Sequence, residues 1–270
     1  MESEHLVITG GSSGIGLDLA LAYAASGWSI SIVARDKQRL QQAVEACEQR
    51  AVSPTQRFYA YSLDVSNPAE LESLSQRIEA TSGTPDLVIM SAGICYSKRF
   101  IDDSDASFEQ VFLTNVMGSR AIANAFLPGM IAKQKGQLCF VSSMAGLVPV
   151  YGYSAYNTSK FALLGMAGAL RQELYEYNIS VSVLCPPEVD TPLIAEEAKH
   201  ILPQTRLLKN VGGTLTVDAV TRSTIRGLKK KRFLILPGFM AKLTHFQARL
   251  APRLSAWITQ QLVNRATSSR

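Results

Sequence analysis

The sequence is poor in the residues that build disulfide frameworks and metal sites. It has four cysteines in 270 residues, Cys47, Cys95, Cys139 and Cys185, and none of them forms a CxxC pair. Its three histidines show no ligand spacing. We therefore expect reduced thiols, mostly buried, and no metal site.

Long apolar segments are missing as well. No run of about 18 uninterrupted apolar residues occurs, which argues against a simple membrane-spanning helix. The opening residues, MESEHLVITG, lack a basic segment followed by an apolar one, which argues against a secretory signal and favours a cytoplasmic protein. With 47% hydrophobic and 18% charged residues, the chain is too apolar to be disordered. Its length suits one large domain with an appendage.

Basic residues are concentrated at the C-terminal end. Residues 226–270 contain ten Lys or Arg and no Asp or Glu. Of the 27 basic residues in the chain, 17 remain for residues 1–225, against 22 acidic ones, so this body carries a net charge of −5. Such an asymmetry indicates an appendage that meets an anionic surface, and the acidic body does not suit a nucleic-acid binder.

Short apolar runs alternate with segments of helical periodicity over the first two thirds of the chain. The run His5–Thr9 ends at glycines, as a buried parallel strand does, and residues 14–26 then follow a helical spacing. The repeated alternation predicts an α/β protein with a doubly wound parallel sheet. Strands are expected at residues 5–9, 29–34, 57–62, 86–91, 137–142 and 180–185, and helices at residues 14–26, 37–50, 68–81, 107–133 and 153–177.

The remaining residues are less regular. The stretch 191–216 has weak periodicity and is interpreted as a lid or substrate loop, followed by a helix at 217–228 and a last strand at 233–236. We expect a domain at 1–228 that includes the substrate loop 187–216, and a basic extension at 229–270.

A glycine-rich turn follows the first expected strand. Glycines allow a tight turn and let the backbone approach a pyrophosphate, while the helix that starts near residue 13 offers free N–H groups and a positive dipole end. This position between a strand and a helix is where a dinucleotide fingerprint belongs, and the alternative is an ordinary glycine-rich turn. The residues that we expect to contact the dinucleotide here are Gly10, Ser12, Ser13, Gly14, Ile15 and Gly16.

The end of the second expected strand bears on the choice of dinucleotide. An NAD-specific protein usually places an acidic residue there to hold the ribose hydroxyls, whereas this chain has Arg35. A guanidinium favours a 2′-phosphate, so NADP is preferred, with Arg39 assisting. The acidic residue at the next position, Asp36, keeps NAD as an alternative cofactor. The other alternative is that Arg35 is an ordinary solvated residue that binds no phosphate.

A serine, a tyrosine and a lysine are the candidate catalytic residues. Tyr156 and Lys160 are four residues apart within a predicted helix, so their side chains share one face. A neighbouring cation is expected to lower the pKa of the phenol, which could then exchange a proton with a carbonyl oxygen during hydride transfer. Ser143 follows a strand whose carboxyl end faces the ligand crevice. From there the serine hydroxyl can stabilise the negative charge that develops on the substrate oxygen.

On these residues the chain resembles the short-chain dehydrogenase/reductase family, over roughly residues 5–225. The resemblance implies a Rossmann fold, an adenine contact at Asp64 and Val65, and a cofactor contact at Ala92 and Gly93. It also implies that Asn115 organises a proton relay through Lys160. The two asparagines that usually precede Ala-Gly are Met90 and Ser91 here, and Pro186-Pro187 replaces the usual Pro-Gly. Val189 and Thr191 match the family's positions that contact the nicotinamide end of the cofactor.

The segment 186–207 is similar to that of 3-ketodihydrosphingosine reductases. This similarity implies NADPH-dependent reduction of a long-chain lipid ketone, 3-ketodihydrosphingosine to dihydrosphingosine, in sphingolipid biosynthesis. A reductase of another lipid or steroid ketone, or a non-catalytic NADPH sensor at a membrane, is the alternative. Family members often form dimers or tetramers, so a homodimer or homotetramer is expected.

Four acidic residues could attract the ammonium group of such a substrate: Glu188, Asp190, Glu196 and Glu197. For Glu196 and Glu197, the alternative is that they form the solvated start of a helix. The candidate groove residues, with core packing as the alternative, are Leu147, Val148, Val150, Tyr151, Tyr153, Leu193 and Ile194.

Residues 239–262 read as one amphipathic helix, bent at Pro252. Apolar residues recur at helical spacing from Phe239 to Leu262, and basic residues lie between and before them. Such a helix suits the interface of an anionic membrane, so we expect peripheral attachment on the cytoplasmic face through residues 229–265. The alternative is that the same stripe packs on the body or on another subunit.

Overall fold

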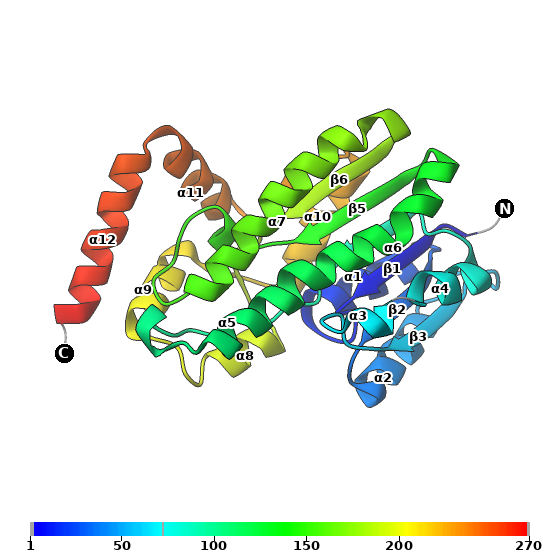
Figure 1. Cartoon of the computed structure of the whole chain (residues 1–270), viewed down its shortest axis with the longest axis horizontal. Helices are drawn as coiled ribbons and strands as arrows, with labels where there is room; N and C mark the ends of the chain where they lie inside the picture. The colour runs from blue at the N-terminus through cyan, green and yellow to red at the C-terminus, as the bar shows by residue number, and fades with distance from the viewer. Residues whose placement is uncertain (1–2, 72, 269–270) are drawn as a thin grey trace.

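The computed structural model describes residues 3–71 and 73–268. Its main sheet has seven parallel strands in the order β3-β2-β1-β4-β5-β6-β9 (Figure 1). The chain returns from β3, at one edge, to β4 beside β1, and this return makes the sheet doubly wound. The strands are β1 His5–Thr9, β2 Ser29–Ala34, β3 Phe58–Ser62, β4 Leu87–Met90, β5 Gly136–Val141, β6 Ile179–Leu184 and β9 Leu234–Ile235. The expected fold class is confirmed.

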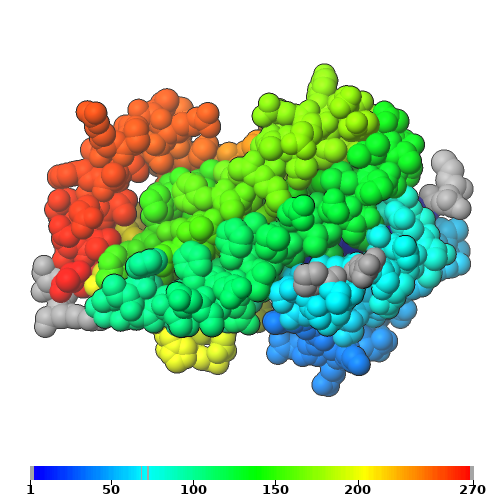
Figure 2. Space-filling view, in the orientation of Figure 1, coloured from blue at the N-terminus to red at the C-terminus, as the bar shows by residue number. Residues whose placement is uncertain are grey.

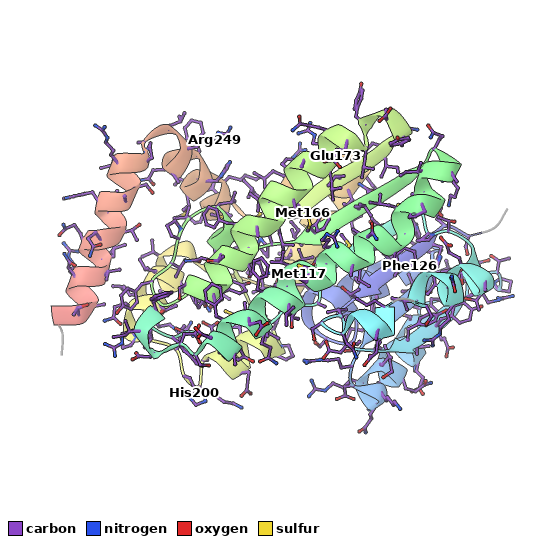
Figure 3. All side chains as sticks on the ribbon, in the orientation of Figure 1. Met117, Phe126, Met166, Glu173, His200 and Arg249 are labelled. Carbon is purple, nitrogen blue, oxygen red and sulfur yellow. The ribbon has the colours of Figure 1, made fainter. Side chains whose placement is uncertain are left out.

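Helices cover both faces of this sheet. The helices are α1 Gly14–Ala24, α2 Lys37–Glu48, α3 Pro68–Leu71, α4 Leu74–Ser82, α5 Asp105–Phe112, α6 Gly118–Lys133, α7 Ser154–Glu173 and α10 Val217–Lys229. Side chains alternate along each strand: Val7 joins the core under α4, α6 and α7, where Phe126 is fully buried (labelled in Figure 3). Leu6 and Ile8 join the core under α1, α2 and α10. This alternation is what a parallel sheet buried on both faces requires.

Three expected elements differ in the structure. The helix expected at 68–81 is divided into α3 and α4, and the one expected at 107–133 is interrupted by a π-helical turn, η2, at Leu113–Met117. The expected lid contains α8 Pro192–Glu197, α9 Pro203–Gly212 and the short strand β8 Thr214–Leu215, which pairs with β7 Glu188–Val189. Prolines at the first helical positions start α8 and α9, because proline fixes φ and needs no N–H partner there.

The C-terminal extension is two helices instead of one bent helix. α11 spans Phe239–Leu250 and α12 spans Pro252–Ser268, and Ala251 between them has a non-helical backbone. Proline disfavours helical geometry in the residue before it, which explains the break. α12 lies beside α9 at the end of the molecule opposite the N-terminus (Figure 1). β9 belongs to the main sheet, so the sheet continues beyond residue 228, the expected end of the domain.

The four cysteines are free and buried, as expected for thiols that serve the core. No helix among the described residues is long and apolar enough to cross a membrane.

A buried histidine in β1 gives a prediction for stability. The Nε2 atom of His5 lies 2.9 Å from the Ser31 hydroxyl, and burial lowers the pKa of His5 from 6.5 to about 4. Between these values the unfolded chain binds a proton that the folded chain excludes, so stability is lost as the pH falls from 6.5 towards 4. We expect His5 to contribute about 3 kcal/mol to this loss.

Chemical denaturation of the wild type and of His5→Gln at several pH values measures this contribution. The variant, which has no titrating ring, should lose less of its free energy of unfolding over the interval. Equal losses in the two proteins would show that His5 does not titrate with the lowered pKa.

Candidate functional site

One large cavity, of about 660 Å³, opens at the carboxyl ends of the sheet strands. The positions predicted from the sequence converge on it, although they come from segments between residues 10 and 191. Those that line it are Gly10, Ser12, Ser13, Gly14, Ile15, Arg35, Arg39, Asp64, Val65, Ala92, Gly93, Ser143, Tyr156, Lys160, Val189 and Thr191. Gly16 and Asn115 are not part of its lining.

The glycine turn is packed so closely that side chains are excluded. A Cβ atom at Gly10, where φ is +66°, would lie 2.8 Å from the backbone nitrogen of Ala92. A Cβ atom at Gly16 would lie 2.4 Å from the carbonyl oxygen of Gly10. Gly16 therefore allows α1 to pack against the turn, while Gly10 and Gly14 face the cavity. The turn leaves a side-chain-free cradle at the N-terminus of α1, which fits the pyrophosphate of a dinucleotide.

Two arginines lie at the end of the cavity beyond this turn. The side chains of Arg35 and Arg39 are each 63% exposed, and both line the cavity. Asp36 caps α2, where its carboxylate accepts a hydrogen bond from the backbone N–H of Arg39. Asp64 lies 3.6 Å from Arg35, and although burial raises its pKa, hydrogen bonds from Ser66 and the charge of Arg35 lower that pKa overall. The local structure thus assigns Asp36 to helix capping.

Ser143, Tyr156 and Lys160 meet at the opposite end of the cavity. The Ser143 hydroxyl accepts a hydrogen bond of 3.1 Å from the N–H of Ala145 and lies near enough to Tyr156 to lower the pKa of the phenol. Nζ of Lys160 lies 5.4 Å from the centre of the Tyr156 ring and donates a hydrogen bond of 2.9 Å to the carbonyl of Val141. The start of α7 supplies the tyrosine and lysine, and the end of β5 supplies the serine. The geometry places a hydroxyl, a phenol and an amine at one wall.

The electrostatics of this wall differ from the expectation that Lys160 lowers the pKa of Tyr156. Burial raises the pKa of Tyr156 well above its usual value, and the hydrogen bond from Ser143 offsets only part of that effect. Burial also lowers the pKa of Lys160 to about 8. Removal of water penalises the charged form of each group, so the phenol stays protonated. A protonated phenol is suited to donate a proton to a carbonyl oxygen that becomes an alkoxide.

Asn115 lies behind the cavity wall, fully buried within η2. Its Oδ1 accepts a hydrogen bond from the N–H of Ile94, and its Nδ2 donates to the Ile94 carbonyl and to the Ser159 hydroxyl. The side chain thereby joins the end of β4 to α7, next to Lys160. Single π turns inside helices occur frequently at functional sites. The relay through Asn115 that the family resemblance implies stays a prediction.

The Pro186-Pro187 segment keeps an ordinary backbone despite the missing glycine. Among the described non-glycine residues, positive φ angles occur at Gln134, Asn178 and Lys231 only. The carbonyl of Pro186 accepts a hydrogen bond of 2.9 Å from the N–H of Met144, next to Ser143. Beyond it, Val189 is buried in β7 and Thr191 begins α8, so both still face the cavity.

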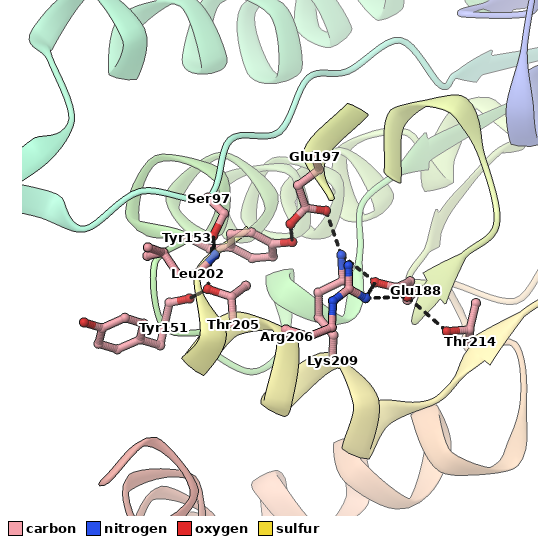
Figure 4. A network of polar contacts seen from close by, with 10 residues as sticks. All are labelled: Ser97, Tyr151, Tyr153, Glu188, Glu197, Leu202, Thr205, Arg206, Lys209 and Thr214. Atoms are coloured by element: carbon pink, nitrogen blue, oxygen red, sulfur yellow. Dashed lines mark hydrogen bonds and ion pairs between the residues drawn. The ribbon is translucent and has the colours of Figure 1, made fainter. Parts of the chain in front are cut away.

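A buried network of charges ties α8 and α9 to the start of α7 (Figure 4). Lys209 bridges two carboxylates, with Nζ 2.6 Å from Glu188 and 2.7 Å from Glu197. The Tyr153 hydroxyl donates a hydrogen bond to Glu197. The Tyr153 ring in turn meets the Tyr156 ring edge-on, with centres 5.3 Å apart. The network therefore holds Tyr156 from the side of the substrate loop.

This network changes the interpretation of the acidic residues. Burial alone raises the pKa of Glu188, but hydrogen bonding to Lys209 and Thr214 and the charge of Arg206 lower it overall. The side chain of Glu197 is 1% exposed, so its interpretation as a solvated helix start was wrong, whereas Glu196 is exposed. Both buried carboxylates are already paired with cations, which removes them as free partners for a substrate ammonium.

The sequence reasoning missed part of the cavity wall. Leu208, Lys209 and Val211 of α9 line it, as do Thr244, Gln247, Ser255, Ile258 and Leu262 of the two C-terminal helices. Thr244, Gln247 and Ser255 form a second, polar stripe beside the apolar one, and this stripe was the signal that could have found them, whereas Ile258 and Leu262 belong to the apolar stripe itself. Of the seven candidate groove residues, the structure places five at the cavity, Val148, Val150, Tyr153, Leu193 and Ile194, but not Leu147 or Tyr151.

These observations define a dinucleotide-binding α/β oxidoreductase with its reaction site at the ends of β5 and α7. The family model for "short chain dehydrogenase" matches residues 4–201. The chain belongs to the short-chain dehydrogenase family, and it is an oxidoreductase that depends on a nicotinamide dinucleotide.

The comparisons with known proteins agree on this family. The chain is 34% identical over 234 residues to a 3-dehydrosphinganine reductase of Danio rerio, covering 86% of this chain and 70% of the relative. It is 32% identical to a 3-ketodihydrosphingosine reductase of Dictyostelium discoideum, covering 94% and 80%. Among solved structures, a short-chain dehydrogenase from Streptomyces avermitilis has a TM-score of 0.81 at 24% identity, covering 99% of each chain. The solved structures support the fold, and the relatives support the family.

Proposed function

We propose that this protein reduces a long-chain lipid ketone with NADPH, and that the substrate is 3-ketodihydrosphingosine. The observation that carries this proposal is the shared cavity, in which a protonated Tyr156 and Ser143 lie at one end and two arginines lie at the other. The relatives at 32–34% identity, which are named for this reaction, support the choice of substrate.

The chain's own residues then have distinct roles. The glycine turn holds the pyrophosphate, Arg35 and Arg39 hold the 2′-phosphate, and Lys160 holds the nicotinamide ribose. When bound, the cofactor supplies a hydride to the carbonyl carbon. Ser143 donates a hydrogen bond that orients the ketone oxygen and stabilises its negative charge. Tyr156 then transfers its proton to that oxygen, which completes the alcohol.

A group of apolar residues in the cavity wall suits an alkyl chain. Val148, Val150, Leu193 and Ile194 line the cavity together with Tyr156, and Ile258 and Leu262 add to its apolar wall. Burial of alkyl groups along such a wall is favourable by about 0.8 kcal/mol for each methylene. A long chain therefore gains binding free energy that a short ketone lacks.

The arginine pair gives a prediction for cofactor choice. Replacing Arg35 by Ser removes a guanidinium that can pair with a 2′-phosphate but leaves the Asp36 cap of α2 in place. We expect kcat/KM for NADPH to fall by about 10- to 100-fold, in line with the loss of one charge-assisted contact, while that for NADH changes little. Steady-state kinetics with both cofactors measure this, with Arg57→Ser as the control, because Arg57 directly precedes β3 and does not line the cavity. A parallel fall for both cofactors would show that Arg35 does not select NADPH.

A ketone panel tests the proposed function itself. Consumption of NADPH and of NADH is measured with 3-ketodihydrosphingosine, a steroid ketone, an acyl thioester with a 3-keto group and a short soluble ketone. The proposal expects turnover of the long-chain amino ketone with NADPH. Turnover with the steroid or the thioester alone would overturn the substrate, and inactivity with every ketone would favour a sensor of NADPH.

Assembly as a homodimer or homotetramer remains a prediction. Small residues such as Gly118 on α6 and Gly165 on α7 are compatible with close packing between subunits. A Cβ atom at Gly118 would lie 2.8 Å from the carbonyl of Val65, so this glycine serves packing within the subunit. A Cβ atom at Gly165 would meet nothing within 4 Å apart from its own stretch of helix, and the nearby Phe161 is exposed, so α7 is the better candidate for a contact between subunits.

A further inference from the structure

The two C-terminal helices have two different faces. One face lines the cavity through Thr244 and Gln247 of α11 and Ile258 and Leu262 of α12. The opposite face is exposed and rich in large apolar side chains: Phe239, Leu243, Phe246, Leu250, Leu254 and Trp257. Phe246 is 62% and Trp257 is 60% exposed. The helix pair is thus a thin wall between the substrate cavity and the outside.

The outer face is surrounded by positive charge. Lys242, Arg249 and Arg253 are exposed on the same helices, and Lys229–Arg232 precede them (Arg249 is labelled in Figure 3). Among residues 3–71 and 73–268, none of these seven side chains forms a salt bridge with a carboxylate. Residues 226–270 contain no Asp or Glu that could neutralise them.

The position of the pair in the molecule leaves its outer face accessible. α11 and α12 project at one end of the space-filling view, away from the sheet and its covering helices (Figure 2). α12 is held to the body along α9, where Gln204 donates a hydrogen bond of 3.2 Å to the Thr267 hydroxyl. Large exposed apolar patches in soluble proteins usually mark an interaction site.

We propose that this outer face docks on an anionic lipid bilayer, and that the lipid substrate passes from the bilayer under α11–α12 into the cavity. Aromatic and aliphatic side chains ringed by Lys and Arg are the composition that binds an anionic interface. A second copy of the chain is a poorer occupant, because a two-fold contact through this face would bring two sets of unpaired cations together. The docking does not depend on the proposed function, whereas the passage of substrate rests on it.

Tryptophan fluorescence tests the docking directly. The chain has two tryptophans, and Trp28 packs edge-on against Tyr23 in the body. In full-length Trp28→Phe, Trp257 is the only reporter. We expect its emission to shift to the blue with phosphatidylglycerol vesicles and to be quenched by brominated acyl chains. The shift should be small with phosphatidylcholine and should weaken as salt screens the charges. An emission spectrum unchanged by anionic vesicles would overturn the proposal, as would a shift caused by protein concentration alone.

A pair of matched variants locates the contact. Phe246→Ser with Leu250→Ser removes apolar surface from the outer face without touching the cavity lining. We expect vesicle binding to weaken by about tenfold or more. Phe100→Ser with Ile101→Ser removes similarly exposed side chains from the short 3-10 helix η1 (Phe100–Asp102) and should leave vesicle binding unchanged. Equal losses in the two double variants, or none in the first, would contradict docking through α11–α12.

Kinetics separate docking from substrate entry. Anionic vesicles should lower KM for a long-chain ketone presented in the bilayer, with little effect on a short soluble ketone, and Phe246→Ser with Leu250→Ser should lose this gain while retaining kcat. Vesicle binding without any gain for the long-chain ketone would refute entry under the helices. Failure to reduce any long-chain ketone, with Trp257 still buried by vesicles, would refute the proposed substrate and leave the docking in place.

Discussion

Replacing Tyr156 by Phe should lower kcat by about 10²- to 10⁴-fold, which is the range that a positioned general acid contributes. The substitution removes one oxygen atom and leaves the ring that contacts Tyr153 and lies near Lys160. Without the phenolic proton, the oxygen of the reduced ketone must take its proton from water, which a buried wall excludes. Because the glycine turn and the arginines are unchanged, the affinity for NADPH should stay within about twofold of the wild type.

Single-turnover oxidation of bound NADPH measures the chemical step, and a fluorescence titration measures cofactor binding. Tyr175→Phe is the control, since Tyr175 is 85% exposed and does not line the cavity. Ser143→Ala should also slow the chemical step, because it removes the hydroxyl that would donate a hydrogen bond to the ketone oxygen beside Tyr156. Turnover of Tyr156→Phe at the wild-type rate would exclude Tyr156 as the proton donor.

Replacing Lys209 by Met should produce the largest loss of stability near the site. Lys209 is 9% exposed and is the cation that pairs with Glu197, while Glu188 keeps Arg206 and Thr214 as partners. Removing one partner of a buried ion pair leaves an uncompensated charge, which costs about 3–5 kcal/mol. The loss should extend to catalysis, because Glu197 holds Tyr153 and the Tyr153 ring packs against Tyr156.

A double variant separates the buried charge from the lost packing. Adding Glu197→Gln to Lys209→Met removes the unpaired carboxylate, so the free energy of unfolding should recover in part. Lys199→Met is the matched control, because the Lys199–Glu196 pair on the same segment is exposed and should contribute little to stability. If Lys209→Met were no less stable than Lys199→Met, the network would not support the substrate loop.

The glycine turn and the Ser143, Tyr156 and Lys160 positions could be predicted because their chemistry is tied to local sequence. A turn after a buried strand needs glycine wherever a Cβ atom would meet backbone, as at Gly10 and Gly16. An i, i+4 pair on a helix shares a face whatever surrounds it. The doubly wound parallel sheet followed from the alternation of strands and helices, since right-handed crossovers leave few arrangements, whereas the order of its strands came from the structure.

The pairing of Lys209 with Glu197 and the second face of α11–α12 could not be predicted in the same way. Glu197 follows Glu196 in the sequence, yet one side chain is buried and the other exposed, because only one of them points from α8 towards α9 and Tyr153. Ile258 and Leu262 belong to the same apolar pattern as Trp257, but the contact of α12 with α9 turns them to the cavity.

The sequence alone determined the fold class, the family and most of the residues that line the cavity, since strand periodicity, glycine placement and helical spacing are properties of neighbours along the chain. Only the tertiary structure decided the direction in which the pKa of Tyr156 is shifted and which charges are paired. The pKa shift and the ion pairs depend on the removal of water and on partners that are far apart in the sequence. Burial and a close charged partner shift a pKa more strongly than mere proximity in the sequence does.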